Sequence, residues 1–401
     1  MTVILCWTGL VVMSSLYVTI PLIPVFAQHY GISAAEAATA GSVFSIGFAI
    51  GCLVYGALSD KYGRKTVIFV GLLCLTLISV FIGSVHSFGW IVMLRGLQGA
   101  AAATFSPVAL AYAVEMYPVE KRVTTVGFIS TGFLIAGIVG QVISSSISEQ
   151  YGWNAVFYLL AVVYAVTAAF VFFFLPKGIR HSAHASIWEP IKQIGNVFIQ
   201  KQLVYCYLVA FVLLMSFVSM YTVLGSYLSQ SPFELSKQDI LYVRFFGIIG
   251  MFVSPFAGGI SKRIGIRVTL RGGLLLAVIG LAFMGMISNL PLLIVMSILF
   301  VGGIALAVPS LVSLVGQLSG KMRGIAVSVY TFILFAGTSF DPIISLYFMK
   351  SGSYLITFLL LAMILCVGLL AACLIHRDET VEAQLSSQFF IYIVKENSTY
   401  K

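Results

Sequence analysis

The sequence predicts an all-α polytopic membrane protein in which twelve transmembrane helices form two pseudo-symmetric six-helix bundles. Three observations lead to this prediction. Hydrophobic residues make up 60% of the 401-residue chain and charged residues only 9%, a composition outside the range of soluble globular proteins. Apolar runs of about 20 residues, the length that crosses a bilayer as a helix, recur along the chain. The second half of these runs also repeats motifs of the first half.

The apolar runs are too long and too uniformly apolar for barrel strands, so a helical bundle is the architecture that satisfies the backbone within hydrocarbon. We expect an N-terminal six-helix bundle over residues 1–175, a cytoplasmic linker over 176–202, a C-terminal bundle over 203–375 and a cytoplasmic tail over 376–401. The runs lie near residues 3–26, 37–58, 67–86, 89–113, 123–148, 153–175, 203–228, 239–260, 268–288, 291–316, 325–348 and 354–375.

The positions of the basic residues predict the orientation. Of the 22 Lys and Arg residues, 18 lie in connections on one side of the predicted topology or in the tail, and the other four are Arg95, Arg244, Lys237 and Lys350. By the positive-inside rule that side faces the cytoplasm, so we expect both termini on the cytoplasmic side. We also expect the protein to lie in the cell membrane. The same scattered distribution argues against a nucleic-acid partner despite the net charge of +9.

The longest connection predicts a short amphipathic helix at the cytoplasmic interface, because Ile187, Ile191, Ile194 and Phe198 recur at helical spacing. The two histidines of this connection lie in a polar loop, where such a pair is far more often a surface feature than a metal site. We therefore expect no metal ion.

The stretch GALSDKYGRK, residues 56–65, carries the densest cluster of charges in the chain and lies between two apolar runs. Gly56 would let one helix approach a neighbour closely, and Gly63 would permit a tight turn. Asp60 and Arg64 are four residues apart, which is within pairing distance if this stretch is helical. A related stretch, GGISKRIGIR at residues 258–267, keeps both glycines but has lysine in place of Asp60.

Three charged residues lie within the predicted spans: Arg95, Arg244 and Asp341. Each is expensive in hydrocarbon and is expected to face the bundle interior or a wet cavity. Counted along their helices, all three lie roughly 8 to 11 Å from the external end, at 1.5 Å per residue. We expect Arg244 to pair with Asp341, which belongs to the same half, and Arg95 to pair with Gln141, the repeat counterpart of Asp341.

Of these charged groups only Asp341 titrates at accessible pH, because arginine stays protonated. A carboxylate that exchanges between a proton and an arginine or a substrate would couple transport to the proton gradient. The alternative is a structural ion pair that never opens. Both remain open at this point.

Three motifs resemble those of the major facilitator superfamily, and most closely its twelve-helix drug/proton antiporter branch. The strongest is Gly56-x-Leu58-Ser59-Asp60-x-x-Gly63-Arg64-Lys65, which is similar to the family's signature between helices 2 and 3. The others are Arg95-x-x-Gln98-Gly99 in helix 4 and Pro21-Leu22-Ile23-Pro24 at the end of helix 1. We count Arg95 and Gln98, with Gln141, Arg244 and Asp341, among the expected proton-coupling and cavity residues.

The resemblance implies a role for the first hairpin. In the family the carboxylate equivalent to Asp60 contacts helix 11, and the arginine equivalent to Arg64 reaches an acidic residue at the end of helix 4, here Glu115. Gly56, Asp60, Gly63, Arg64 and Glu115 would then form a gating latch that closes the cytoplasmic side. The alternative is a loop that only sets topology, with surface charges worth about 0 to 1 kcal/mol each.

The resemblance weakens in helix 5, where the antiporter signature has a Gly-Pro pair and a Gly-Gly pair, whereas the equivalent stretch here, residues 132–141, contains no proline. Gly137 and Gly140 of the same helix match the region that acts as a hinge or seal in the family, although close helix packing explains them as well. Tyr17 and Tyr221 occupy matching positions in helices 1 and 7, which line the cavity in this fold.

Three functions are compatible with these observations. The first is a proton-coupled antiporter that exports a small apolar or amphipathic compound, because polar residues are scarce where a sugar cavity would need them. The second is a symporter or facilitator for uptake of a nutrient, favoured by the altered helix 5 motif. The third is a membrane sensor without transport. We find no catalytic residue set and expect no enzyme, no cofactor beyond the proton gradient, a lipid bilayer as surroundings, and a monomer.

Overall fold

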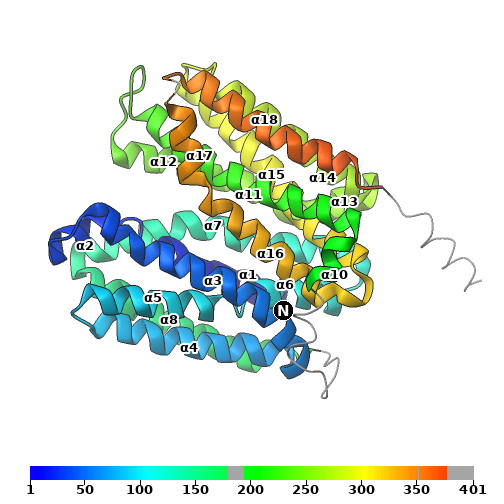
Figure 1. Ribbon diagram of the computed structural model, residues 1–401, viewed down its shortest axis with the longest axis horizontal. Coiled ribbons are helices and arrows are strands. Elements are labelled where there is room, and N and C mark those ends of the chain that lie inside the picture. Colours follow the sequence, from blue (N-terminus) through cyan, green and yellow to red (C-terminus); the bar gives the residue numbers. More distant parts are fainter. Residues whose placement is uncertain (179–193, 351, 377–401) are drawn as a thin grey trace, which may run out of the picture.

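The structure is a computed structural model that describes residues 1–178, 194–350 and 352–376 (Figure 1). All the regular elements in these ranges are helices. Most of the predicted linker helix, with Ile187 and Ile191, and the tail from residue 377 lie outside the described residues.

The first half of the chain forms eight helices, which occupy the lower layer in Figure 1. They are α1 (Thr2–Tyr17), α2 (Ile23–Tyr30), α3 (Ala34–Tyr62), α4 (Arg64–Ser84), α5 (Phe88–Ala102), α6 (Ser106–Met116), α7 (Val119–Tyr151) and α8 (Trp153–Phe174).

The second half forms the upper layer. Its elements are α10 (Ile194–Ile199), α11 (Lys201–Leu228), α12 (Lys237–Met251), η1 (Ser254–Phe256), α13 (Ala257–Ile264), α14 (Ile266–Met284), α15 (Leu290–Leu318), η2 (Gly320–Met322), α16 (Arg323–Ser339), α17 (Asp341–Met349) and α18 (Tyr354–Cys373).

Several expected spans are divided where a proline occurs. Pro24, Pro107, Pro255 and Pro342 each lie in the first turn of α2, α6, η1 and α17, respectively. Proline lacks a backbone N–H and is tolerated in a first turn, where that group has no partner within the helix. Pro309 is different, because it lies inside the unbroken helix α15.

Within the described ranges, ten helical segments are long and apolar enough to cross a membrane. Two further helices, α1 and α16, are apolar but shorter than this limit. Both are the first parts of expected spans that the structure divides in two. Twelve crossings therefore stay a prediction, while a multi-pass helical architecture is a property of the structure.

The two halves repeat the same helix pairings. In the first half α1 packs along α7, α3 along α5 and α4 along α8, and in the second half α11 packs along α16, α12 along α15 and α14 along α18. These pairs correspond one to one in chain order. The two turn glycines correspond as well, with φ 90° and ψ 138° at Gly63 and φ 92° and ψ 148° at Gly265. The repeat predicted from the sequence is therefore present in the backbone.

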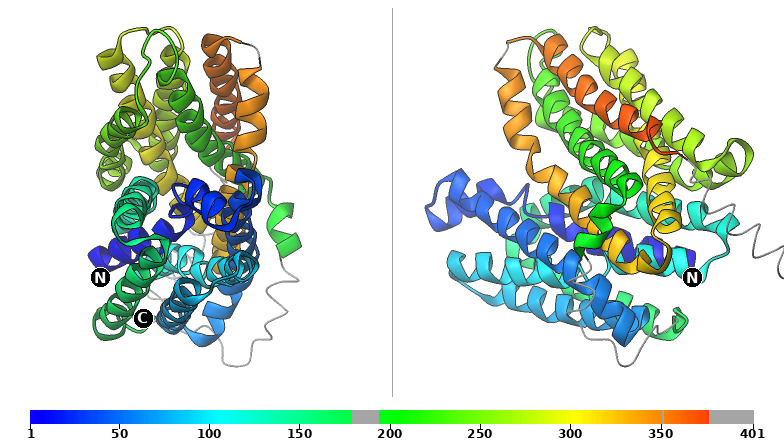
Figure 2. Two further views of the ribbon diagram at one scale, coloured as in Figure 1. Left: turned by 90° about the vertical axis from the view of Figure 1, so that its left-hand side faces the viewer. Right: turned by 45° about the vertical axis from the view of Figure 1, so that its right-hand side comes forward.

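The two layers meet at one end and separate toward the other (Figures 1 and 2). They meet where α3 and α6 contact α16, and where α7 contacts η1, α13 and α15. They separate toward the end that carries α2 and the start of α12. We call the first the basic end, because Lys61, Lys65, Lys262 and Arg263 lie in its hairpins.

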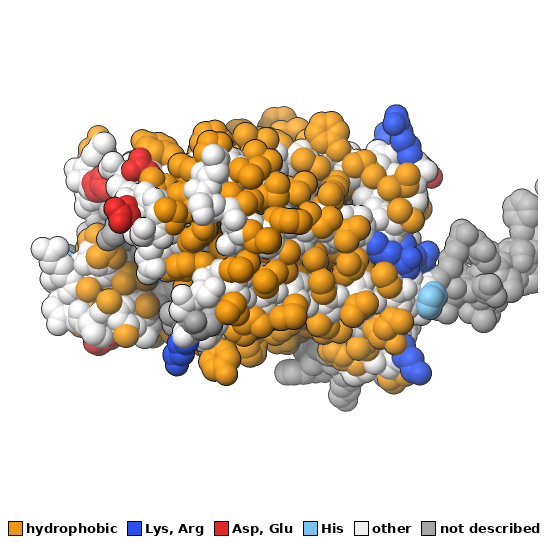
Figure 3. All heavy atoms as spheres, turned by 90° about the horizontal axis from the view of Figure 1, so that it is seen from above, with side chains coloured by type: hydrophobic (Ala, Val, Ile, Leu, Met, Phe, Trp, Pro, Cys, Tyr) orange, Lys and Arg blue, Asp and Glu red, His pale blue; other side chains and the backbone are white. Residues whose placement is uncertain are grey.

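The distribution of hydrophobic and charged side chains on the surface is that of a membrane protein. Hydrophobic side chains cover the middle of the face in Figure 3, whereas acidic side chains gather at one end and most of the basic ones at the other. Large exposed residues such as Phe173 and Leu77, with 74% and 60% of their surface accessible, belong to helices long enough to span. Such residues face lipid at little cost, although they would be a liability in water.

Candidate functional site

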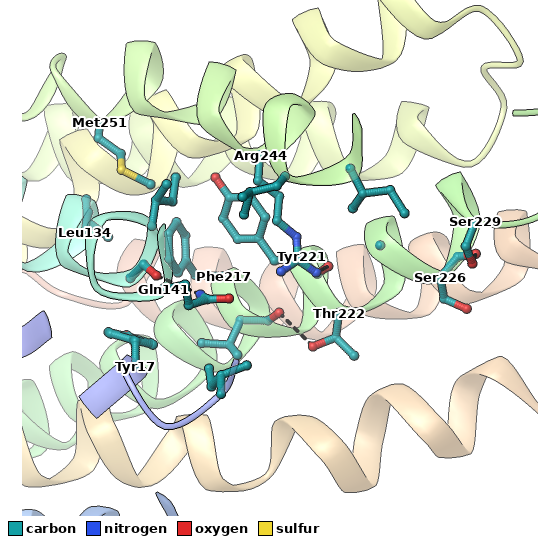
Figure 4. Close-up of a pocket in the computed structure, with 17 residues that line it drawn as sticks. Tyr17, Leu134, Gln141, Phe217, Tyr221, Thr222, Ser226, Ser229, Arg244 and Met251 are labelled. Atoms are coloured by element: carbon teal, nitrogen blue, oxygen red, sulfur yellow. Dashed lines mark hydrogen bonds between the residues drawn. The ribbon is translucent and has the colours of Figure 1, made fainter. Parts of the chain in front are cut away.

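A cavity of about 570 Å³ lies between the two layers, in the part of the molecule away from the basic end (Figure 4). This volume is within the range of small-molecule sites. Helices α1 and α7 line it from one layer and α11 and α12 from the other. The lining residues are Tyr17, Ile20, Leu134, Gly137, Ile138, Gln141, Phe217, Val218, Tyr221, Thr222, Gly225, Ser226, Ser229, Ile240, Leu241, Arg244 and Met251.

The cavity has mostly apolar side chains at its inner end, with Gln141 among them, and serines at its mouth. Leu134 and Met251 lie at the inner end, while Ser226 and Ser229 lie at the opposite end (Figure 4). The arrangement admits an apolar body first and leaves hydrogen-bonding groups near the entrance.

Aromatic rings form much of the wall. The rings of Phe217 and Tyr221 are 5.3 Å apart in an edge-to-face arrangement on α11. The hydroxyl of Tyr221 is buried without a hydrogen-bond partner in the described structure, and an added Cβ at Gly247 would overlap it. Tyr17 is the last residue of α1 and faces the cavity from the other layer.

Arg244 comes from the second turn of α12 and points into the cavity (Figure 4). Its Nη2 donates to the carbonyl oxygen of Tyr221 at 3.0 Å. Gly225 makes room for the guanidinium, because an added Cβ there would lie 2.7 Å from Nη2. The expected partner Asp341 is the first residue of α17, but its side chain lies outside the described part, so this pair stays a prediction.

Gln141 also lines the cavity. Gly137 and Gly140, the glycines expected in the fifth span, lie close to it in α7. The Gln141 side chain donates to the Gly137 carbonyl oxygen at 2.7 Å. An added Cβ at Gly137 would lie 3.6 Å from the Tyr17 ring, which is ordinary contact, whereas one at Gly140 would lie 2.7 Å from the Ser14 carbonyl oxygen. Gly140 therefore lets α7 pack tightly on α1, and Gly137 leaves space in the cavity wall.

The expectation that Arg95 pairs with Gln141 is wrong. Arg95 is fully buried within the first layer, where it donates to the Ser15 carbonyl oxygen at 2.9 Å and to Gln98 Oε1 at 2.5 Å. Its guanidinium also lies 4.2 Å from the centre of the Phe44 ring. The reason is rotational: Arg95 has the expected height along α5 but faces α1 and α3 rather than the cavity.

Gln98 belongs to the same buried cluster and does not line the cavity. Its amide group donates to Ser79 Oγ at 2.8 Å, which ties α5 to α4. Arg95 and Gln98 therefore join several helices of the first layer through a network of hydrogen bonds. In the structure this network is a packing element.

At the basic end, Arg64 forms ion pairs with two acidic residues, Asp60 and Glu115. Only 1% of Arg64 is exposed, and it donates to Glu115 through Nη2 at 2.6 Å and Nε at 3.2 Å. The same Nη2 forms an ion pair with Asp60, and Nη1 bonds the Gly56 carbonyl oxygen at 3.1 Å. The bidentate arginine–carboxylate geometry fixes the arrangement of these groups, and removing one partner of a buried pair is costly because it leaves a buried charge without compensation.

This cluster, which we call the Arg64 cluster (Asp60, Arg64 and Glu115), lies against α16 of the other layer. An added Cβ at Gly324 would lie 2.7 Å from Asp60 Oδ2 and 3.1 Å from Arg64 Nη2. One at Gly56 would overlap the Ser328 hydroxyl. The predicted contact between the first hairpin and the eleventh span is therefore present, and it depends on glycine on both sides.

The second hairpin makes an equivalent contact with α7. An added Cβ at Gly258 would overlap Thr124 Oγ1, and one at Gly127 would overlap the backbone of Ser254. Further along the same contact, Thr131 Oγ1 donates to the Met251 carbonyl oxygen at 3.4 Å. Both hairpins thus seal the basic end, one with an ionic cluster and the other by shape.

Sequence reasoning missed the partner side of this seal. Gly324 and Ser328 on α16 are four residues apart, a small-xxx-small spacing that marks close helix packing in membranes. That spacing was a usable signal. The apolar inner wall of the cavity, with Leu134 and Met251, carried no signal, because such residues are common in all spans.

Comparison with known proteins now adds to this geometry. The chain matches the family description "Major Facilitator Superfamily" over residues 5–340 and 245–391. It is 26% identical to an uncharacterized MFS-type transporter, YybF, of Bacillus subtilis, covering 92% of this chain and 93% of that protein. It is also 26% identical to the multi-drug resistance efflux pump PmrA of Streptococcus pneumoniae, covering 64% of each chain. The inner membrane transport protein YnfM of Escherichia coli is 26% identical over 66% of this chain and 64% of its own.

Proposed function

The chain belongs to the Major Facilitator Superfamily and is a membrane transporter rather than an enzyme, and on that premise we propose that it exports a small apolar or amphipathic compound in exchange for protons. The observation that carries this proposal is the position of the cavity between two layers that are sealed at one end. A cavity reached from one side at a time is the requirement for alternating access. Similarity to an efflux pump supports the direction.

In this proposal the basic end faces the cytoplasm, with both termini on that side of the cell membrane, because cytoplasmic connections carry the excess of Lys and Arg. The protein acts as a monomer, with residues 1–175 and 203–375 as its two moving bundles. The structure then corresponds to an outward-facing state. The Arg64 cluster and the second hairpin hold its cytoplasmic side shut.

The latch hypothesis rests on the contacts of Asp60 with Arg64 and its closeness to Gly324. Asp60→Asn should weaken the closed side and raise the accessibility of buried positions there to thiol reagents applied from the cytoplasm. Lys61→Gln is the matched control, since it removes a neighbouring charge, and the contact described for the Lys61 amine is with the Tyr62 ring. Unchanged transport rate and unchanged accessibility in Asp60→Asn would refute the latch.

For proton coupling we propose Asp341, because it is the one acidic residue predicted within a span and it begins α17 beside the cavity helices. Its proton would be exchanged as the cavity changes sides, with the gradient as the energy source and no other cofactor. A carboxylate that stays paired throughout the cycle is the alternative. The two differ in the pH dependence of exchange.

A second candidate is uptake by symport or facilitation. It is favoured by α7, which runs unbroken from Val119 to Tyr151 without the proline of the antiporter motif. Flux measurements separate the two. Proteoliposomes loaded with a compound found by thermal-shift screening should release it faster when an inward proton gradient is imposed. Accumulation of the compound driven by protons moving in the same direction would establish uptake instead and refute export.

A further inference from the structure

The charge of the cavity bears on the chemistry of what binds there. Arg244 is the one charged side chain among the 17 described residues that line it. None of the side-chain carboxylates that the structure describes forms an ion pair with it, and the side chain of Asp341 lies outside that part. A cation in a largely apolar enclosure is costly unless a counter-charge is supplied. Among the described side chains that line the cavity, the positive charge of Arg244 therefore has no counter-charge.

The hydrogen-bonding capacity of Arg244 is also largely unused. Guanidinium has five N–H donors in a planar fork. The one acceptor recorded for it among the described residues is the Tyr221 carbonyl oxygen, and its Nε is buried without a partner. A planar fork of this kind matches the two oxygens of a carboxylate.

The surroundings of Arg244 set the shape of the remaining ligand. Phe217 and Met251 lie on the inner side of Arg244, and the serines of the mouth lie on its other side (Figure 4). Gln141 points into the same space from α7. Its Nε2 donates to the Gly137 carbonyl oxygen, and its amide group can also form a hydrogen bond with a ligand. A ligand whose carboxylate meets Arg244 would thus place its apolar body against Phe217 and Met251.

We propose that the substrate class of this cavity is an amphipathic organic monocarboxylate, bound by Arg244 through its carboxylate and by the aromatic inner wall through its body. The inference rests on the proposed function, because it takes the cavity as the transport site. A cationic amphiphile of the same shape would meet the charge of Arg244 without gaining a counter-charge from any described lining residue. The cavity therefore selects against cations.

Three probes with one apolar body test the proposal: 2-naphthoate, 2-naphthamide and 2-naphthylmethylammonium. Binding to the purified full-length protein is measured by calorimetry at constant ionic strength, so that screening is the same for all three. The carboxylate should bind roughly 10- to 100-fold more tightly than the amide, the range expected for hydrogen bonds to a charged group. The ammonium compound should bind most weakly.

Variants assign the effect to the residue. Arg244→Gln should bind naphthoate and naphthamide equally, whereas Arg244→Lys should keep part of the preference, because it retains the charge but loses the fork. Lys350→Gln removes an exposed cation from the same end of the molecule, outside the cavity, and should bind as the unmodified protein does. The thermal transition of each variant without ligand checks that it is folded.

The proposal is overturned if the ammonium compound binds as tightly as naphthoate, if none of the probes binds, or if Arg244→Gln keeps the preference. Failure of proton-driven flux for any compound would instead refute the proposed function. Because the probes are compared by binding and not by flux, the two failures are distinguishable.

Discussion

Replacing Gly56 with alanine should open the sealed end of the protein, because this residue is where α3 meets α16. An ideal Cβ at position 56 would overlap the Ser328 hydroxyl, lie 2.8 Å from Ser328 Cβ and lie 3.2 Å from the Gly324 carbonyl oxygen. Rotation of the serine side chain cannot relieve the Cβ contact. The two helices must therefore move apart.

The size of the shift between the two conformations depends on the conformation in which the overlap occurs. Overpacking of a tight contact costs about 1–3 kcal/mol. The overlap is present only while α3 and α16 touch, so this cost falls entirely on the state with the basic end closed. A free-energy difference of that size changes the ratio of two conformations by roughly 5- to 150-fold.

The assay follows a buried position at the seal. Ser254 is fully buried and its hydroxyl has no hydrogen-bond partner in the described structure, so cysteine is a mild replacement there. In a background with the six native cysteines replaced, a membrane-impermeant maleimide is applied to inside-out vesicles. Alkylation at position 254 should be faster when Gly56 is alanine, because the seal opens more often.

Neighbouring glycines supply the controls. Gly258→Ala should act like Gly56→Ala, since its Cβ would overlap Thr124, whereas Gly259→Ala should not, since nothing lies within 4 Å of the added atom. Combining Gly56→Ala with Ser328→Gly should restore slow alkylation. If Gly56→Ala is alkylated no faster than Gly259→Ala, the steric argument is wrong.

Three further changes test other parts of the structure. Glu115→Gln should lower the midpoint of thermal unfolding, because it removes one of the two carboxylates paired with the buried Arg64, at a cost of about 1.5–3 kcal/mol while Asp60 remains; an unchanged midpoint would contradict the buried cluster. Gln98→Ala should lower stability by about 1–3 kcal/mol, since it leaves a donor of Arg95 without its acceptor, and substrate affinity in calorimetry should stay the same. Asp341→Asn should abolish pH-dependent exchange in proteoliposomes while circular dichroism remains that of the folded protein; full proton-coupled flux in this variant would exclude Asp341 as the proton carrier.

Much of the fold could be predicted because hydrophobic run length and basic residues report directly on membrane crossing. The divisions at Pro24, Pro107, Pro255 and Pro342 were not predicted, because a hydropathy count is insensitive to a single missing backbone donor. The repeat was visible in the hairpin glycines, and the structure extends it to the pairing of whole helices.

The candidate site was less predictable. A position counted along a run gives the height of a residue in the membrane but not the direction in which it points. Arg95 and Arg244 were expected at the same depth in the membrane. In the structure Arg244 points into the cavity, whereas Arg95 packs inside its own half. Rotation about the helix axis is set by packing partners from distant parts of the chain, which no local pattern contains.

The seal at the basic end relies on close approach of small residues more than on a large apolar surface. Its tightest contacts pair Gly56 with Ser328, Gly258 with Thr124 and Gly127 with Ser254, and one small apolar cluster, Val123, Ala257 and Leu306, lies beside the second hairpin. Burial stabilises by about 25 cal/mol per Å² of apolar area, so the contacts between backbone atoms and small hydroxyl residues add little to the stability of the closed state. A seal of this kind suits a protein that alternates between conformations separated by only a few kcal/mol.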